Sequence, residues 1–231
     1  MLLPVPNYIT LVFIITVLIT LTLFLWTIKR AASKALPIAI AILLFILIFQ
    51  GILSYTGFYT ENLFSIPPRF PINILPPLIF IIFLFNSKKG KSFIDKLSLG
   101  DLALISIVRI PVEICIYWFA MEKIVPNELT FEGRNWDILS GITAPLIAYA
   151  YYKGYIGRKT LLIWNFVALI LVIAIVSQAI LAIPSPFQQM GIDQPNIAVL
   201  YFPFNWLASF IVPIVFFTHF AALRQLLLRH E

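Results

Sequence analysis

Long apolar stretches of this chain are separated by short connections that are basic on one side and acidic on the other. Hydrophobic residues make up 61% of its 231 residues, charged residues make up 11%, and the mean hydropathy is +0.99. Such a composition excludes an ordinary water-soluble fold, because too few polar residues remain to cover a core. The chain is therefore predicted to lie in a lipid bilayer.

The apolar stretches predict an all-α, polytopic membrane protein. Inside a bilayer each span must satisfy its own backbone hydrogen bonds, so spans are helices or strands of a closed barrel. Stretches of roughly 20 apolar residues without alternating polarity favour helices. We expect one domain over residues 1–231, a seven-helix transmembrane bundle with spans at about 8–28, 36–55, 71–85, 98–121, 137–152, 161–183 and 203–228.

The orientation follows from Lys and Arg in the short connections, because these residues stay on the cytoplasmic side during insertion. Twelve basic residues fall on one side: Lys29, Arg30, Lys34, Lys88, Lys89, Lys91, Lys96, Lys153, Arg158, Lys159, Arg224 and Arg229. The other side carries three basic and six acidic residues: Arg69, Lys123, Arg134, Glu61, Glu122, Glu128, Glu132, Asp137 and Asp193. We expect the N-terminus outside and the C-terminus in the cytoplasm.

Several classes of function are excluded by the residues that the sequence contains. The only cysteine, Cys115, lies in a predicted span, so we expect no disulfide framework and no cysteine-based metal cluster. His219 is the only histidine in a span, which excludes a bis-histidine haem, and we interpret it as a packing residue. The net charge of +6 reflects the insertion bias. We therefore expect membrane lipids as partners, no nucleic acid, no cofactor and no resident metal.

The strongest chemical signal is the run Arg109-Ile-Pro-Val-Glu113, in which two opposite charges stand one helical turn apart deep inside the fourth predicted span. An intramembrane charge costs roughly 2.5–3.5 kcal/mol on insertion scales, so both side chains are expected to face the bundle interior. Helical spacing adds Ser106 and Tyr117 to the same polar stripe.

Two interpretations of this stripe stay open. The charges form a self-neutralising pair that fixes helix register, or they line a polar cavity that binds an anionic or zwitterionic molecule or relays protons through Glu113. In the second interpretation Arg109 clamps a carboxylate or phosphate. Prolines in four of the predicted spans are expected to loosen the same bundle: Pro76, Pro77, Pro111, Pro145 and Pro213.

The outer connections at 128–137 and 184–196 are dense in polar, aromatic and turn residues. Arg134 adds positive charge there, and Asp137 and Asp193 are expected near the positive dipole ends of the fifth and seventh spans. We interpret Asp137 as a helix cap. A calcium-like site formed by Glu132, Asp137 and Asp193 is an alternative, although the spacing of these residues matches no known calcium loop.

The stretch from Arg109 to Phe204 contains RIPVE, TFEGRNWDILSG, PSPFQQ and DQPNIAVLYFPF. With these motifs it resembles a group of uncharacterised multi-pass inner-membrane proteins of Bacteroidetes-type bacteria. The resemblance covers under half of the chain, and its motifs carry no known activity or catalytic residues. It implies a location in a bacterial inner membrane and no particular chemistry.

We expect the protein to bind a small acidic solute or lipid headgroup in an outward-facing polar cavity, as a sensor or transporter does. The candidate ligand-binding residues are Ser106, Arg109, Glu113, Tyr117, Arg134, Asp137 and Asp193. One alternative is a structural subunit, assembled with another membrane protein or with copies of itself. Another is a membrane-embedded enzyme that modifies a lipid with Glu113 or Asp137 as general base, although no nucleophile and base are paired in the sequence.

Overall fold

The computed structural model describes residues 2–228 and confirms the predicted all-α class. The described residues contain no β-strand beyond one isolated bridge, between Leu2 and Phe202. Its α-helices are α1 (Asn7–Ala32), α2 (Leu36–Tyr55), α3 (Pro71–Asn86), α4 (Lys88–Ile94), α5 (Leu99–Ile105), α6 (Arg109–Met121), α7 (Ile138–Tyr152), α8 (Arg158–Leu181) and α9 (Val212–Leu228). Arg229, one of the predicted cytoplasmic residues, lies outside the described part.

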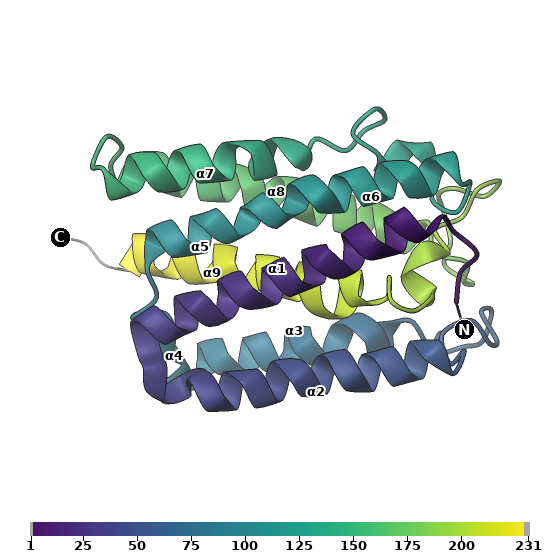
Figure 1. The fold of residues 1–231 in the computed structure, drawn as a ribbon, viewed down its shortest axis with the longest axis horizontal. Coiled ribbons are helices and arrows are strands. Elements are labelled where there is room, and N and C mark those ends of the chain that lie inside the picture. Colours follow the sequence, from purple (N-terminus) through teal and green to yellow (C-terminus); the bar gives the residue numbers. More distant parts are fainter. Residues whose placement is uncertain (1, 229–231) are drawn as a thin grey trace.

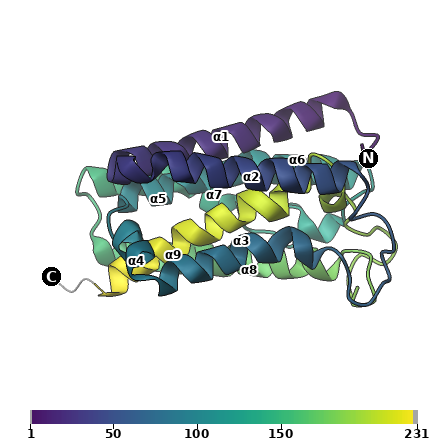
Figure 2. The same ribbon diagram turned by 90° about the horizontal axis from the view of Figure 1, so that it is seen from below.

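The long helices lie side by side along the longest axis of the molecule (Figure 1). α1 and α2 form an antiparallel hairpin, because Ala32 with φ −152° and ψ 62° breaks the helix before the short turn Ser33–Ala35. α5 continues through the 3-10 turn Ser106–Val108 into α6, so these elements form one rod. The start of the chain lies at one end of the bundle, and α9 ends at the other (Figures 1 and 2).

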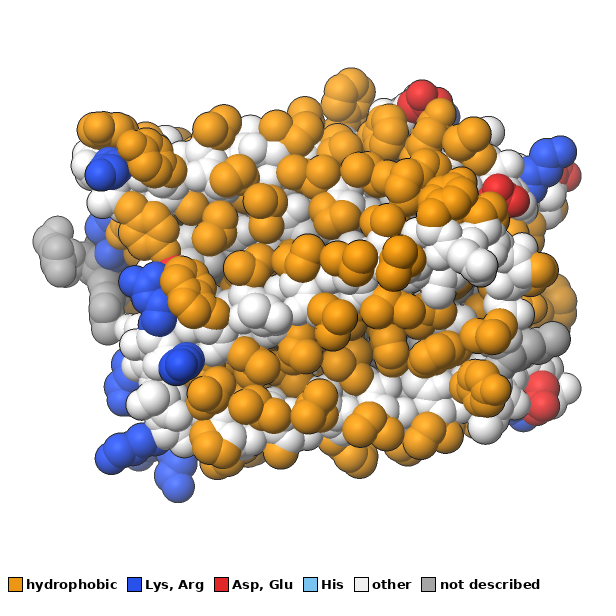
Figure 3. Space-filling view, in the orientation of Figure 1, with side chains coloured by type: hydrophobic (Ala, Val, Ile, Leu, Met, Phe, Trp, Pro, Cys, Tyr) orange, Lys and Arg blue, Asp and Glu red, His pale blue; other side chains and the backbone are white. Residues whose placement is uncertain are grey.

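The outward surface of the bundle is apolar, and charge is confined to its two ends. Large hydrophobic side chains such as Phe45, Leu146 and Ile163 are about two-thirds exposed. Figure 3 shows this apolar belt with most of the Lys and Arg at one end and the acidic side chains, beside a few basic ones, at the other. Soluble proteins rarely expose apolar patches of this extent, whereas lipid-facing surfaces require them.

Within residues 2–228, four helical stretches are long and apolar enough to cross a membrane, or five when the bent pair α3–α4 counts as one span. The four are Asn7–Tyr55, Leu99–Met121, Arg158–Leu181 and Leu207–Leu228. The first includes both helices of the α1–α2 hairpin. This number of apolar helices is that of a membrane protein.

Prolines shape the helices that surround the bundle interior. Pro77 and Pro145 lie inside α3 and α7. Pro111 lies in the first turn of α6, after the 3-10 turn Ser106–Val108, and Pro213 lies in the first turn of α9, after the π-helical turn Leu207–Ile211. Proline lacks the N–H that would bond to the preceding turn, so the helical turn is tightened before Pro111 and widened before Pro213.

Helix α7 is too short to run the full length of the bundle. Its 15 residues rise about 22 Å, whereas the hydrocarbon core of a bilayer is about 30 Å thick. Figure 1 shows α7 beginning part way along the bundle, so the segment before it returns into the interior from the end that carries most of the acidic side chains, which we call the outer end. Asn135 and Asp137, at the end of that segment, are 3% and 4% exposed. Irregular backbone is tolerated at this depth because protein surrounds it.

The end of the bundle that carries most Lys and Arg is closed by contacts between helix termini. Arg30 on α1 pairs with Asp101 on α5 at 3.0 Å, and the Tyr152 hydroxyl also donates to Asp101. Arg224 on α9 pairs with Asp95, at the end of α4, at 3.1 Å. These contacts fix the helices at this end, opposite the end to which the polar segment before α7 belongs.

Candidate functional site

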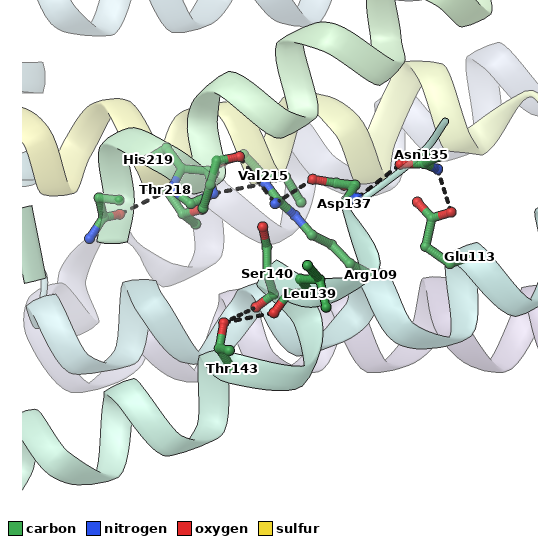
Figure 4. Close-up of polar contacts among 12 residues, drawn as sticks. Arg109, Glu113, Asn135, Asp137, Leu139, Ser140, Thr143, Val215, Thr218 and His219 are labelled. Atoms are coloured by element: carbon green, nitrogen blue, oxygen red, sulfur yellow. Dashed lines mark hydrogen bonds and ion pairs between the residues drawn. The ribbon is translucent and has the colours of Figure 1, made fainter. Parts of the chain in front are cut away.

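Arg109, the first residue of α6, is the centre of a buried polar network. Its side chain is 3% exposed, and Nη1 donates to Asp137 Oδ1 at 2.7 Å and to the Ala168 carbonyl oxygen at 3.2 Å. Nη2 lies 2.8 Å from Nε2 of His219 (Figure 4). The guanidinium therefore joins α6 to the start of α7, to α8 and to α9.

The contacts of His219 fix the position of its proton. Arginine can only donate, so Nε2 accepts from Arg109 and the proton of a neutral imidazole resides on Nδ1. Nδ1 lies 3.0 Å from Asn165 Oδ1, which accepts that proton in a hydrogen bond. Asn165 Nδ2 in turn donates to the Leu161 carbonyl oxygen at 3.0 Å. Both ring nitrogens are thus occupied, and His219 bridges α8 and α9 to Arg109.

Asn135 extends the network to Glu113. Its Nδ2 donates to a carboxylate oxygen of Glu113 and to the Leu129 carbonyl oxygen, and its Oδ1 accepts from the backbone N–H of Asp137 at 2.9 Å. Glu113 is 2% exposed. A continuous set of contacts therefore runs from Asn165 on α8 to Glu113 on α6. We call these residues the outer network: Arg109, Glu113, Asn135, Asp137, Asn165 and His219.

Arg109 and Glu113 are both buried, but their ion-pair and hydrogen-bond partners lie on other elements, and the two side chains do not form the pair expected within one helix. Figure 4 shows Arg109 reaching toward His219 while Glu113 reaches toward Asn135. Arg109 takes Asp137 as its ion-pair partner because the segment before α7 enters the bundle beside it. Asp137 occupies the N-cap position of α7, as predicted, but within residues 2–228 its side chain accepts no capping hydrogen bond and pairs with Arg109 instead.

The remaining candidate residues lie apart from the network. Ser106 is buried, and its Oγ has no hydrogen-bond partner among the described residues. Tyr117 is half-buried and stacks on Phe131 with ring centroids 5.1 Å apart. Arg134 and Asp193 are exposed. In the part of the chain that the structure describes, no three His, Cys, Asp or Glu side chains are grouped as metal ligands, so the alternative calcium site is not formed.

Sequence reasoning missed three of the six network residues as site residues: His219, interpreted as a packing residue, Asn165 and Asn135. Asn135 stands in a polar connection beside Arg134 and Trp136, which are both exposed. No periodicity marks it, because it precedes the helix. The one available signal is its position two residues before Asp137, where an asparagine side chain can bond to the backbone N–H.

A cavity of about 80 Å³ lies beside the outer network. Apolar side chains of α3, α6, α8 and the π turn form most of its wall, and Glu113, Asp137 and Asn196 are the polar residues lining it. Asn196 Nδ2 donates to the Ala179 carbonyl oxygen at 3.1 Å, whereas its buried Oδ1 finds no partner within residues 2–228. Ile180, which also lines the cavity, is 42% exposed at the bundle surface. We call this space the outer cavity.

The outer cavity offers hydrogen-bond acceptors rather than donors. Carboxylates accept, and the amide of Asn196 has its oxygen left over. When ionised, Glu113 and Asp137 carry two negative charges against the single positive charge of Arg109. The arrangement therefore suits a group that donates hydrogen bonds or carries positive charge.

Comparison with known proteins identifies the family. A family model described as a domain of unknown function (DUF8737) matches residues 75–227. No curated protein and no solved structure matches the chain. The matched residues cover about two-thirds of the sequence and include the whole outer network. The chain therefore belongs to the DUF8737 family.

Proposed function

We propose that the chain is a multi-pass protein of a bacterial inner membrane, with seven spans, its N-terminus outside and its C-terminus in the cytoplasm. The antiparallel arrangement of α1 and α2 supports two spans within Asn7–Tyr55. The basic residues at one end support the orientation (Figure 3). The bacterial membrane rests on the sequence resemblance.

Cysteine labelling in spheroplasts tests this topology. Cys115 is buried, so single-cysteine additions report their own accessibility to a membrane-impermeant reagent. We expect Asp193→Cys to react from outside and both Lys89→Cys and Gly157→Cys to be protected until the membrane is opened. Labelling of Gly157→Cys in intact spheroplasts would overturn the orientation.

We propose further that the protein binds a lipid or another amphiphile in the outer cavity, with the polar end of the ligand beside Glu113, Asp137 and Asn196. One observation carries this proposal: the polar groups that line an otherwise apolar cavity are acceptors, and one buried acceptor lacks a partner among the described residues. A buried polar group without a hydrogen-bond partner destabilises the folded state, and a hydrogen-bond donor on the ligand removes that destabilisation. Exposure of Ile180 supports entry of the ligand sideways from the lipid.

This geometry favours a hydroxyl or amine over the acidic group expected from Arg109 alone. Both terminal nitrogens of Arg109 already contact protein groups, and Arg109 is not among the residues lining the cavity. An acid would have to displace Asp137 from the guanidinium. A donor needs no such displacement, because the acceptors already line the cavity.

A structural role is the second candidate, and the links that the outer network makes between helices favour it. Arg109 alone contacts three other helical elements, which fixes their register without any ligand. A catalytic role receives no comparable support, because both nitrogens of His219 are engaged.

Thermal unfolding in phosphatidylcholine nanodiscs tests ligand binding. The probes are a long-chain amine, a monoacylglycerol and a fatty acid with the same acyl chain at the same mole fraction. A ligand that binds only the folded state raises the melting temperature. We expect the amine and the monoacylglycerol to stabilise the wild type and the fatty acid to have a smaller effect.

Two variants of α8 make the test specific. Ala179→Phe places a ring in the outer cavity, whereas Ala174→Phe adds the same ring at an exposed position outside it. Stabilisation by the amine should persist in Ala174→Phe and disappear in Ala179→Phe. If only the fatty acid stabilises the protein and Arg109→Gln abolishes its effect, the ligand is an acid. If no probe stabilises the wild type, the structural role replaces ligand binding.

A further inference from the structure

A second and larger cavity lies in the other half of the bundle. Its volume is about 180 Å³. The last turns of α1 and α3, the first turns of α2, and α4 and α9 line it, so it lies at the end of the molecule where Lys and Arg gather (Figures 1 and 3). We call it the inner cavity.

The wall of the inner cavity is almost entirely apolar and therefore suits a hydrocarbon chain. Of the described residues that line it, Ser209 alone is polar, and its Oγ donates to the Asn205 carbonyl oxygen at 3.1 Å. Phe24 and Phe217 are buried in the wall, whereas Ile38 is 65% exposed at the bundle surface. An apolar cavity of roughly 150 Å³ stays dry and accepts a hydrocarbon. The inner cavity is larger, and the exposure of Ile38 places its mouth on the lipid-facing surface.

Lysines follow the edge of this cavity. Lys34 directly precedes the lining residue Ala35, and three more stand between the lining residues Leu84 and Phe93: Lys88, Lys89 and Lys91. Within residues 2–228 every ion pair uses an arginine, so no lysine is neutralised by such a pair. The nearby carboxylates of Asp95 and Asp101 are taken by arginines. The lysines are therefore available to an external anion.

Helix α4 is built to hold these lysines at the bundle end. It turns by 93° from α3, and Ser87 Oγ accepts from the Gly90 N–H at 3.0 Å at the corner. Gly90 is packed so closely that an added Cβ would lie 2.0 Å from the Leu84 carbonyl oxygen. Lys88 and Lys89 are exposed, whereas Phe93 points into the inner cavity wall. A short helix with one basic and one apolar side is typical of the headgroup region of a membrane.

We propose that the inner cavity and these lysines form a binding site for an anionic phospholipid, with one acyl chain in the cavity and the phosphate at Lys34, Lys88 and Lys89. Basic residues at a membrane surface attract anionic lipid headgroups. A phospholipid fits better than a soluble anion because the apolar cavity and the basic edge adjoin. The assignment to the cytoplasmic leaflet rests on the proposed orientation, and the ligand of the outer cavity plays no part in it.

Native mass spectrometry of the full chain tests this site. The protein is released from micelles containing equal amounts of phosphatidylglycerol and phosphatidylcholine with the same acyl chains, and the lipids retained are counted. We expect the wild type to retain phosphatidylglycerol preferentially. The preference should fall roughly fivefold for each lysine removed in Lys88→Gln/Lys89→Gln. The matched pair Lys153→Gln/Lys159→Gln, directly after α7 and in the first turn of α8, lies at the same end of the bundle and should keep the preference.

Filling the cavity tests the acyl-chain half of the proposal. Ala39→Phe projects into the inner cavity, and Ala41→Phe adds the same ring to an exposed position of α2. Retention of phosphatidylglycerol should be lost in Ala39→Phe and kept in Ala41→Phe. If the lysine variant loses the lipid and Ala39→Phe retains it, the acyl chain of the lipid lies outside the inner cavity and the proposed site is wrong. Equal retention of both lipids by the wild type would also overturn it.

A quenching experiment applies even if Ala39→Phe fails to fold. Ile38→Trp at the exposed mouth and Leu44→Trp, also exposed on α2 but outside the cavity lining, are compared in nanodiscs with brominated acyl chains. Brominated phosphatidylglycerol should quench the tryptophan at position 38 more than brominated phosphatidylcholine does. Equal quenching by the two lipids at position 38 would contradict the proposal. This experiment contains none of the ligands that test the outer cavity, so its outcome does not depend on the function proposed for that cavity.

Discussion

The interiors of the two halves of the bundle differ in polarity. In the outer half, charged, amide and imidazole side chains from α6, α8, α9 and the segment before α7 meet in one network, with Arg109 and Asp137 2.7 Å apart. In the inner half the helices surround an apolar cavity of about 180 Å³, and charge appears only at its edge. The matched family region contains the whole outer network, whereas α1 and α2, which wall the inner cavity, lie outside it.

This difference teaches where helix register is specified. Apolar side chains pack nearly as well against lipid as against each other, so they position a helix only weakly. A buried ion pair with directed hydrogen bonds is satisfied in few geometries, which fixes the helices that contribute to it. We therefore expect the outer half to be sensitive to single polar substitutions and the inner half to be sensitive to changes of shape.

The largest effect is expected from breaking the central ion pair. Arg109→Leu leaves Asp137 buried without its partner, which costs roughly 3–5 kcal/mol in soluble proteins. Unfolding in detergent measures this loss, and the double variant Arg109→Leu/Asp137→Leu should lose less than Arg109→Leu alone. The control is Arg69→Leu, whose partner Glu61 is 66% exposed, so its loss should stay below about 1 kcal/mol. Similar losses for the two arginines would break the comparison.

A smaller effect is expected at the far side of the same network. His219→Phe keeps an aromatic ring but removes the acceptor for Arg109 and the donor for Asn165, at a cost of roughly 2–3 kcal/mol. Gln178→Leu on α8 is the control, because Gln178 Nε2 bonds only to the Ala174 carbonyl oxygen of its own helix in the described structure. Equal unfolding free energies for wild type and His219→Phe would show that the histidine contributes packing alone.

The inner half should respond to shape. Gly90→Ala forces a Cβ against the Leu84 carbonyl oxygen at the α3–α4 corner, and overpacking of this kind costs roughly 1–3 kcal/mol. Gly157→Ala has nothing within 4 Å of its added Cβ, so its change should stay within about 0.5 kcal/mol. Denaturant unfolding distinguishes the two. A Gly90→Ala protein as stable as Gly157→Ala would show that α4 is loosely attached.

The smallest effect concerns a neutral hydrogen bond between Tyr59, in the connection after α2, and Gln50 in α2. The Tyr59 hydroxyl donates to Gln50 Oε1, and burial raises the pKa of Tyr59 above its ordinary value. The folded state therefore keeps the proton more tightly than the unfolded chain, so the wild type should lose stability as pH rises above about 10. Tyr59→Phe should cost about 1 kcal/mol at neutral pH and show a shallower loss between pH 9 and about 11. Parallel pH curves would contradict the assignment.

Composition and hydropathy were sufficient to predict an all-helical chain, and the cost of a buried charge was sufficient to predict that Arg109 and Glu113 face inward. The partner of Arg109 was not predictable, because it depends on α7 beginning below the outer end of the bundle. Local spacing indicated a cap at Asp137, while the tertiary structure assigns its carboxylate to an arginine 28 residues away.

The two cavities were also beyond sequence reasoning. Ile38 at the mouth of the inner cavity is 65% exposed, and Ile81 in its wall is 8% exposed. In a membrane protein the same residue types face lipid and line the interior, so hydropathy does not distinguish them. In the sequence, the lysines beside the inner cavity indicate only the orientation of the chain. Their position beside the cavity depends on the 93° turn between α3 and α4, which the sequence does not show.

The most direct test of the account compares both cavities in one experiment. Wild type, Ala39→Phe and Ala179→Phe are released from micelles containing phosphatidylglycerol, phosphatidylcholine and the long-chain amine, and the molecules retained are counted by native mass spectrometry. We predict that Ala39→Phe loses phosphatidylglycerol and keeps the amine, while Ala179→Phe loses the amine and keeps phosphatidylglycerol. Loss of both molecules in either variant, or of neither in both, would contradict the existence of two chemically distinct sites.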